Sequence, residues 1–381
     1  MTGRSATDPR RWICEDLSVS TSDPLEPYDA VVLVSFGGPE KPEDVVPFLR
    51  NVTRGRGIPD DRLAAVGEHY YRFGGRSPIN DQCRALIAAL RSEFDRQGID
   101  TPIYWGNRNW EPYLTDTFLA AQADGHRRLL VITTSAYPSY SSCRQYRENL
   151  YDAAASTALQ VDRIRQYADH PGFAAASVDA VRAGLDQLAA AGHDPRTARL
   201  VYVTHSIPTA MAEASEKATR GYVSWHNTAA DEITRQLTEA LGVEYRGDLV
   251  YCSRSGAPGQ PWLEPDVNDH LAALQEQGVG SVVVVPIGFI SDHMEVIYDL
   301  DTEAAGTAQQ LGLGFARAAT AGTHPAFVSA LVDLVRERAA VARGEQVEPA
   351  VIPGAEVGAY LCPADCCLNL RQPDRPALCQ A

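Results

Sequence analysis

Four continuous apolar runs, each followed directly by a polar loop, constrain the fold of this chain more than any other feature. The runs cover residues 30–34, 129–132, 200–203 and 282–285. Between them lie helical patterns, with apolar residues every three to four positions. Strands that are apolar on both faces are typical of parallel sheets covered by helices. The alternation therefore predicts an α/β fold built from βαβ units.

The runs fall into two similar halves, which predicts two doubly wound, Rossmann-like domains with parallel sheets. A chain of 381 residues is long enough for two such domains. We expect an N-terminal extension at residues 1–27, a first domain at 28–168 and a second domain at 169–320. A C-terminal helix and a cysteine-rich tail are expected at 321–381.

Charge and composition exclude several classes of protein. The chain has 34 Lys and Arg against 49 Asp and Glu, a net charge of −15, which argues against binding to a phosphate backbone. Its apolar runs are too short for a membrane span, and residues 1–27 hold no apolar secretory segment. No G-x-G-x-x-G or Walker loop follows a predicted strand. We expect a cytoplasmic protein with no integral membrane segment, nucleic-acid partner or nucleotide cofactor.

Cysteines gather at the C-terminus. Of eight cysteines, four lie in the last twenty residues: Cys362, Cys366, Cys367 and Cys379. In a reducing cytosol such a cluster indicates metal or iron–sulfur ligation more readily than disulfides. The spacing does not separate a zinc site from an iron–sulfur site, and a tail with incidental thiols remains the alternative.

Two polar loops after predicted strands carry groups suited to catalysis or metal binding. In an open α/β sheet, ligands bind beyond the carboxyl ends of the strands, so we expect a site between the domains. His205 follows one run and could accept a proton or bind a metal, or be purely structural. Glu295 follows another, and Asp299 and Glu303 continue it at four-residue spacing on one helical face. That face is either a solvated acidic surface or a row of oxygen ligands for a divalent cation.

Residues 50–76 are basic within this acidic chain. They include Arg50, Arg54, Arg56, Arg62, Arg72 and Arg76. Arginine binds carboxylates in a bidentate manner. Together with aromatic residues such as Phe36, Tyr70 and Tyr146, this segment indicates a flat, apolar ligand with several carboxylates; solvated surface arginines are the alternative.

Six motifs, taken together and in order, resemble the ferrochelatase family. They are S-F-G-G-P-E, G-G-R-S-P-I, T-S-A-Y-P-S-Y, V-T-H-S-I-P, P-W-L-E-P-D-V and P-I-G-F-I-S-D-H-M-E-V-I-Y-D-L-D. The resemblance runs from about residue 28 to 340. Within the family, the chain looks most like the actinobacterial coproporphyrin III form, whose C-terminal tail carries a [2Fe–2S] cluster.

The resemblance implies roles for individual residues. His205 and Glu295 match the catalytic pair, with His205 as a neutral imidazole that accepts a proton. Asp299 and Glu303 match an acidic row proposed as a metal or proton route, so all four are expected to contact the metal. Phe36 faces the porphyrin from the other side, where some relatives offer a tyrosine oxygen that phenylalanine lacks. Arg54, Ser77 and Tyr146 match positions that bind the substrate.

The resemblance also implies a substrate and a cofactor. We expect Fe²⁺ insertion into coproporphyrin III, giving coproheme III in heme biosynthesis, because the arginines of residues 50–76 suit four propionates better than two. Protoporphyrin IX as substrate is the alternative, and a non-catalytic tetrapyrrole carrier is a further one. A [2Fe–2S] cluster is expected on Cys143, Cys362, Cys366 and Cys367, with Cys379 as substitute. Transient contact with neighbouring heme-pathway enzymes is expected as well.

Overall fold

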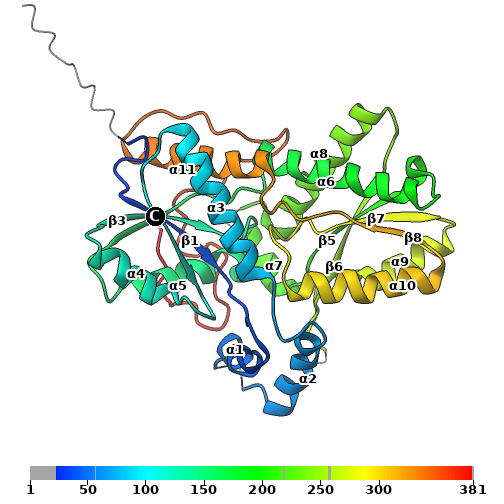
Figure 1. Ribbon diagram of the computed structural model, residues 1–381, viewed down its shortest axis with the longest axis horizontal. Helices are drawn as coiled ribbons and strands as arrows, with labels where there is room; N and C mark the ends of the chain where they lie inside the picture. Colours follow the sequence, from blue (N-terminus) through cyan, green and yellow to red (C-terminus); the bar gives the residue numbers. More distant parts are fainter. Residues whose placement is uncertain (1–22, 56, 218, 256–258, 380–381) are drawn as a thin grey trace, which may run out of the picture.

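The computed structural model describes residues 23–55, 57–217, 219–255 and 259–379. Within them, eight strands form two parallel four-stranded sheets (Figure 1). The strand order is β2-β1-β3-β4 in the first sheet and β6-β5-β7-β8 in the second, so the two sheets have the same topology. The predicted α/β fold with two parallel sheets is confirmed. The domain boundaries stay a prediction, and residues 1–22 of the expected N-terminal extension lie outside the described residues.

The elements have the following bounds. The strands are β1 (Ala30–Ser35), β2 (Ile103–Asn107), β3 (Arg128–Thr133), β4 (Gln160–Arg163), β5 (Arg199–His205), β6 (Gly247–Cys252), β7 (Ser281–Val285) and β8 (Gly314–Arg317). The α-helices are α1 (Val45–Val52), α2 (Asp60–Tyr71), α3 (Ile79–Gln97), α4 (Leu114–Ala123), α5 (Gln145–Ala154), α6 (Pro171–Ala190), α7 (Thr209–Glu216), α8 (Gly221–Leu241), α9 (Val267–Glu276), α10 (Ala305–Leu311) and α11 (Pro325–Ala342). Short 3₁₀ turns are η1 (Pro42–Asp44) and η3 (Pro195–Thr197), and η2 (Tyr140–Arg144) and η4 (Val296–Ala304) are π-helical. No helix in the described parts of the chain is long and apolar enough to cross a membrane.

The four apolar runs of the sequence are the inner strands β1, β3, β5 and β7. Each pairs with a strand on both sides and is almost entirely buried, which explains its continuous apolar character. The edge strands β2, β4, β6 and β8 are partly exposed and carry more polar residues.

Helices cover both faces of each sheet. In β1, Val31 and Leu33 pack with α3, whereas Ala30, Val32 and Val34 pack with α4 and α5 on the opposite face. The second sheet has α6 and α8 on one face and α9 and α10 on the other (Figure 1). This alternation is the period of two expected of a strand buried on both faces.

One hydrophobic core joins the two halves. Helix α11 packs against both α3 and α6. Leu331 and Val335 of α11 belong to the same buried cluster as Leu33 of the first sheet and Leu200 of the second. The shared core therefore holds the carboxyl ends of the two sheets in a defined relation.

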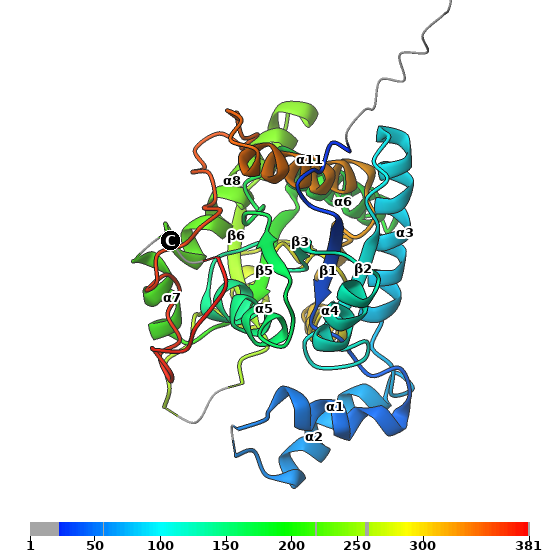
Figure 2. The same ribbon diagram turned by 90° about the vertical axis from the view of Figure 1, so that its left-hand side faces the viewer.

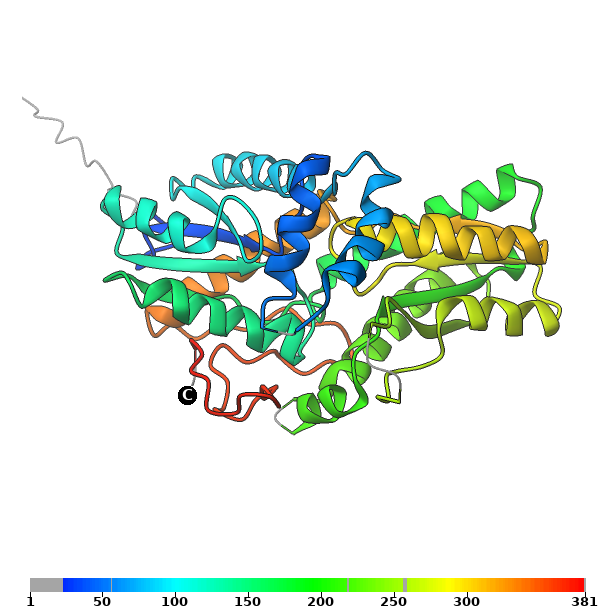
Figure 3. The same cartoon turned by 90° about the horizontal axis from the view of Figure 1, so that it is seen from below.

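Two segments lie outside the layers. The hairpin of α1 and α2 follows β1 and extends beyond the carboxyl ends of the strands (Figure 2). The C-terminal tail returns along α5, where the Leu378 amide donates to the Arg147 carbonyl at 3.1 Å (Figure 3). These placements bring the tail cysteines to the first domain and the basic hairpin to the strand ends.

Candidate active site

The structure brings His205 and Glu295 together at neighbouring strand ends. His205 is the last residue of β5, and Glu295 follows β7, which pairs with β5 in parallel. Nε2 of His205 lies 3.7 Å from one carboxylate oxygen of Glu295, and Nδ1 of His293 lies 3.8 Å from the other. The carboxylate therefore lies between two imidazoles, one from each loop.

Buried contacts hold the backbone at His205. The Tyr222 hydroxyl donates to the His205 carbonyl at 3.0 Å and shares a 2.7 Å hydrogen bond with Thr204. On the other side, the Gly288 amide donates to the Val203 carbonyl at 3.1 Å. A Cβ atom at Gly288 would collide with Thr204, so this close approach of the two loops requires glycine.

The charges of this group are strongly coupled. Burial would raise the pKa of Glu295, but His205 and His293 lower it to about 2. Burial would lower the pKa of His205, but the Glu295 carboxylate raises it to about 8. The Glu295 carboxylate thus favours the protonated form of the His205 imidazole. Its proton must leave before it can act as a base.

The acidic row continues outward from Glu295. Burial, reinforced by the charges of Glu295 and Glu303, raises the pKa of Asp299 to about 7, although Ser253 donates a hydrogen bond to its carboxylate. Glu303 is exposed. The segment that carries Asp299 is π-helical, a rare geometry that is frequent at functional sites. Ser253 follows edge strand β6 and is a site residue that the sequence interpretation missed.

Helix α2 connects this acidic row with the first domain. The His69 imidazole stacks on the Tyr298 ring with centroids 3.8 Å apart. The Phe48 ring contacts Phe36 at 6.2 Å and Tyr70 at 6.0 Å, and the Glu295 charge acts on Tyr70. Phe36 and the His205 group are thus linked through the α1–α2 hairpin.

On the first domain, Phe36 and Tyr146 share a cation between them. The Arg108 guanidinium lies 5.5 Å from the Phe36 ring centroid and 4.5 Å from that of Tyr146. Its Nε donates to Asn149 at 2.7 Å. Arg108 follows edge strand β2 and was missed by the sequence interpretation.

The remaining predicted substrate residues are not brought into this group by direct contacts. Arg54 is exposed after α1 and donates to Asn51 at 2.6 Å, and Ser77 is buried before α3. Arg50 and Arg76 form exposed ion pairs with Asp60 and Asp81. Arg56 lies outside the described residues.

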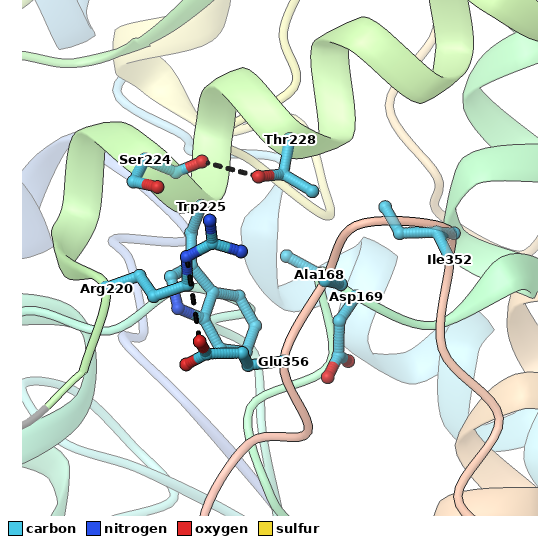
Figure 4. Close-up of a pocket in the computed structure, with 9 residues that line it drawn as sticks. Ala168, Asp169, Arg220, Ser224, Trp225, Thr228, Ile352 and Glu356 are labelled. Atoms are coloured by element: carbon cyan, nitrogen blue, oxygen red, sulfur yellow. Dashed lines mark hydrogen bonds and ion pairs between the residues drawn. The ribbon is translucent and has the colours of Figure 1, made fainter.

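A small pocket lies elsewhere, between α8 and the tail (Figure 4). Trp225 and Arg220 line it, and Arg220 faces Glu356 at 3.9 Å. None of its lining residues belongs to the predicted site.

The predicted cysteine ligands come together from two distant segments. Cys143 lies in the π-helical turn η2, and interaction with Cys362 of the tail raises the pKa of its thiol. Cys362 also contacts Cys366, whose sulfur lies 3.8 Å from that of Cys367. All four are buried. Among the described residues, however, no group of three or more His, Cys, Asp and Glu side chains is arranged to hold a metal ion.

Buried arginines surround these thiols. Arg163 donates to the Cys362 sulfur at 3.2 Å, and Arg147 donates to the carbonyls of Leu378 and Cys379. Both side chains are buried, and no carboxylate in the described ranges forms an ion pair with either. A buried cation without a counter-charge is costly, so this site suits an anionic group.

Comparisons with known proteins agree with the fold. The sirohydrochlorin chelatase SirB from Bacillus subtilis subspecies spizizenii, in complex with cobalt, superposes with a TM-score of 0.50 at 14% identity, covering 83% of this chain and 97% of that one. This likeness concerns the fold, which is that of the chelatases.

The family follows from sequence. The ferrochelatase model matches residues 28–339. A coproporphyrin III ferrochelatase of Streptomyces coelicolor is 53% identical over 352 residues, 90% of this chain and 93% of that protein. A ferrochelatase of Rhodopirellula baltica is 46% identical over 359 residues, 92% of this chain and 96% of that protein. The chain belongs to the ferrochelatase family.

Proposed function

We propose that the protein inserts Fe²⁺ into coproporphyrin III to give coproheme III in heme biosynthesis. The observation that carries this proposal is the His205–Glu295 pair at neighbouring strand ends of a ferrochelatase-family chain. The name of the Streptomyces coelicolor relative, at 53% identity, supports coproporphyrin III as the substrate.

In this proposal the second domain handles the metal and the protons. Insertion requires two pyrrole protons to leave as Fe²⁺ binds. Glu295 is ionised at neutral pH and attracts the cation, whose charge then disfavours the proton on His205. His205 first gives its own proton to the acidic row, then accepts one pyrrole proton as a general base, passes it on in the same way and accepts the second. Asp299, with a pKa of about 7, passes protons outward to exposed Glu303.

The first domain holds the macrocycle. Phe36 is partly exposed and offers its ring to a flat ligand, whereas buried Tyr146 lines the pocket beneath Arg108. The Arg108 guanidinium between the two rings is offered to a propionate. Phe36 has no oxygen, so it contacts the macrocycle without binding the metal. Arg54, in the loop between α1 and α2, and Ser77, just before α3, complete the proposed substrate set.

Coproporphyrin III is favoured over protoporphyrin IX by the surrounding arginines. The ion pairs of Arg50 and Arg76 are exposed, and such pairs contribute only about 0–1 kcal/mol. Both guanidiniums can therefore exchange their partners for substrate carboxylates at little cost. The four propionates of coproporphyrin III can pair with more of these arginines than the two propionates of protoporphyrin IX can.

The test is anaerobic Fe²⁺ insertion into coproporphyrin III and into protoporphyrin IX, followed by the shift of the Soret band. Faster turnover of coproporphyrin III is expected. A preference for protoporphyrin IX would keep the chelatase but overturn the role of the basic hairpin. Porphyrin binding without insertion of iron would indicate the non-catalytic carrier instead.

We further propose a [2Fe–2S] cluster on Cys143, Cys362, Cys366 and Cys367, with Cys379 as substitute. Each iron of a [2Fe–2S] cluster takes only two cysteine ligands. These four cysteines can therefore suit such a cluster although no three of them are arranged around a single metal ion. The buried, mutually contacting thiols and the uncompensated charges of Arg147 and Arg163 support this assignment. When bound, the cluster supplies one-electron redox chemistry.

The remaining proposals concern organisation and surroundings. We propose two domains at residues 28–168 and 169–320, followed by the helix and tail at 321–381. The location is proposed to be cytoplasmic, with transient contact to neighbouring heme-pathway enzymes. The excess of acidic over basic residues supports our proposal that the protein does not bind nucleic acid.

A further inference from the structure

Two arginines of the first half are held by asparagine side chains rather than by carboxylates. Nε of Arg108 donates to Oδ1 of Asn149 at 2.7 Å, and Nη2 of Arg54 donates to Oδ1 of Asn51 at 2.6 Å. Neither arginine forms an ion pair with any residue in the described ranges. An amide oxygen accepts a hydrogen bond but carries no net charge, so both guanidiniums are oriented without being neutralised.

The Arg108 guanidinium is partly buried between the Phe36 and Tyr146 rings. Asn149 lies three residues after Tyr146 on α5, so the two side chains lie on one face of the helix and meet the same guanidinium. In the part of the chain that the structure describes, Nη1 and Nη2 of Arg108 have no hydrogen-bond partner. A partly buried cation without a counter-charge is costly, and these two nitrogens match the two oxygens of a carboxylate.

The orientation of the Asn51 amide is fixed from its other side. Its Nδ2 donates to the Asn109 carbonyl at 3.2 Å and to the Tyr113 hydroxyl at 2.9 Å. Because a carbonyl only accepts, the amide nitrogen faces Asn109 and the amide oxygen faces Arg54. The backbone amide and the side-chain Nδ2 of Asn109 each donate to the Phe36 carbonyl at 3.1 Å. Asn51 thus ties Arg54 to the strand-end loop that carries Phe36.

Other arginines of the same region have carboxylate partners. Arg50 forms an ion pair with Asp60, and Arg76 forms one with Asp81. These two guanidiniums must leave their partners before they bind a carboxylate of the substrate. A guanidinium that is held by an amide needs no such exchange, and no neighbouring anion repels the incoming carboxylate.

We propose that Asn149 and Asn51 are positioning residues that set the affinity for the carboxylates of the porphyrin, because they hold Arg108 and Arg54 with neutral oxygens. The proposal rests on the proposed function, in which these two arginines bind propionates. An aspartate in place of either asparagine would still hold the guanidinium but would cancel its charge. The substrate therefore requires an amide at these positions, and a hydrogen-bond acceptor alone is not sufficient.

The test compares Asn149→Asp with Asn149→Ala in the binding of metal-free coproporphyrin III, measured by fluorescence quenching. Loss of the hydrogen bond in Asn149→Ala should weaken binding roughly two- to fivefold. Cancellation of the charge in Asn149→Asp should weaken it about tenfold or more, and binding should then depend less on salt than in the wild type. Asn227→Asp, exposed on α8, adds the same charge and should bind as the wild type does.

A purely structural role of the hydrogen bond predicts the opposite order of the two variants. An aspartate keeps the acceptor for Arg108, whereas an alanine loses it. Binding by Asn149→Asp that is equal to or tighter than binding by Asn149→Ala would therefore overturn the proposal.

If Asn149→Asp does not fold, Asn51→Asp and Asn51→Ala replace the pair. Both variants lose the hydrogen bonds to Asn109 and Tyr113, but only the aspartate cancels a charge. The salt dependence of binding then decides, and equal salt dependence in the two variants would count against the proposal.

Failure of the proposed function gives a different result. Wild-type protein that binds coproporphyrin III without inserting iron would refute the chelatase, and the order of the two Asn149 variants would still decide this proposal. Wild-type protein that does not bind coproporphyrin III would refute the proposed substrate and, with it, the role of the two asparagines.

Discussion

The two sheets share one topology, but equivalent loops carry different chemistry. After the inner strands, β1 leads to Phe36 and β5 leads to His205. After the edge strands, β2 leads to Arg108 and β6 leads to Ser253. The first half therefore presents aromatic and cationic groups, and the second presents imidazoles and carboxylates with their hydrogen-bond partners. In the proposed function, this repeated scaffold separates substrate binding from metal and proton chemistry.

The same contrast holds for the π-helical segments. Each lies after the third strand of its half: η2 follows β3 and η4 follows β7. In the first half, the wide turn presents Cys143 to the tail. In the second half, it presents Asp299 to Ser253. An equivalent irregularity of the backbone therefore serves a cysteine site in one half and an acidic row in the other.

The strongest test of this division is His205→Ala. Because His205 accepts a proton in the proposed mechanism, kcat should fall about 100- to 10,000-fold. Binding of the porphyrin, measured by fluorescence quenching, should be retained, since the first half holds the macrocycle. His126→Ala, in the first half, is the control. Unchanged turnover of the His205 variant would remove its catalytic role.

The next test is Cys143→Ser. The visible absorbance of the cluster should be lost, because one of its four proposed ligands is replaced by a poorer one. Cys83→Ser, which alters a buried cysteine of α3 away from the tail, should keep the absorbance. Full cluster content in the Cys143 variant would exclude this residue as a ligand.

The division between inner and edge strands also explains what the sequence could predict. Inner strands must be apolar on both faces, so their runs and the residues after them, such as His205 and Glu295, stand out. Edge strands β2 and β6 are partly solvated and show no continuous run. Arg108 and Ser253 follow these strands and were missed for that reason. Searching for a partly polar edge strand beside each apolar inner strand would have identified Arg108 and Ser253.

Ionic partners were the other part that the sequence could not predict. The charge state of His205 depends on a carboxylate that is ninety residues away in the sequence but 3.7 Å away in space. Likewise, the basic residues Arg50 and Arg76 could be listed but not assigned partners, because Asp60 and Asp81 are among many nearby acids. Local patterns identify the side chains, whereas pairing depends on the folded geometry.

A substitution at Arg108 tests whether the first half of the molecule acts in substrate binding alone. Arg108→Met keeps an apolar stem between Phe36 and Tyr146 but removes the guanidinium. KM for coproporphyrin III should rise about tenfold, the equivalent of about 1.4 kcal/mol, with little change in kcat. Steady-state kinetics measure both, with exposed Arg127→Met as the control. A fall in kcat at constant KM would place Arg108 in the chemistry and break the division.

The smallest expected effect concerns Asp299 and the pH dependence of stability. Burial raises its pKa to about 7 in the folded protein, against about 3.9 in an unfolded chain. The protonated carboxyl therefore contributes stability that is fully present below about pH 4 and is lost as the pH rises through about 7. Asparagine does not titrate, so the Asp299→Asn variant lacks this pH dependence. Between pH 5 and 8, the free energy of unfolding should therefore fall by about 1 kcal/mol more in the wild type than in the variant. The value is small because the side chain is partly exposed and screened.

Urea denaturation at each pH measures this difference, with exposed Asp186→Asn as the control. Parallel curves for wild type and Asp299→Asn would show that the acidic row is solvated and carries no proton at neutral pH.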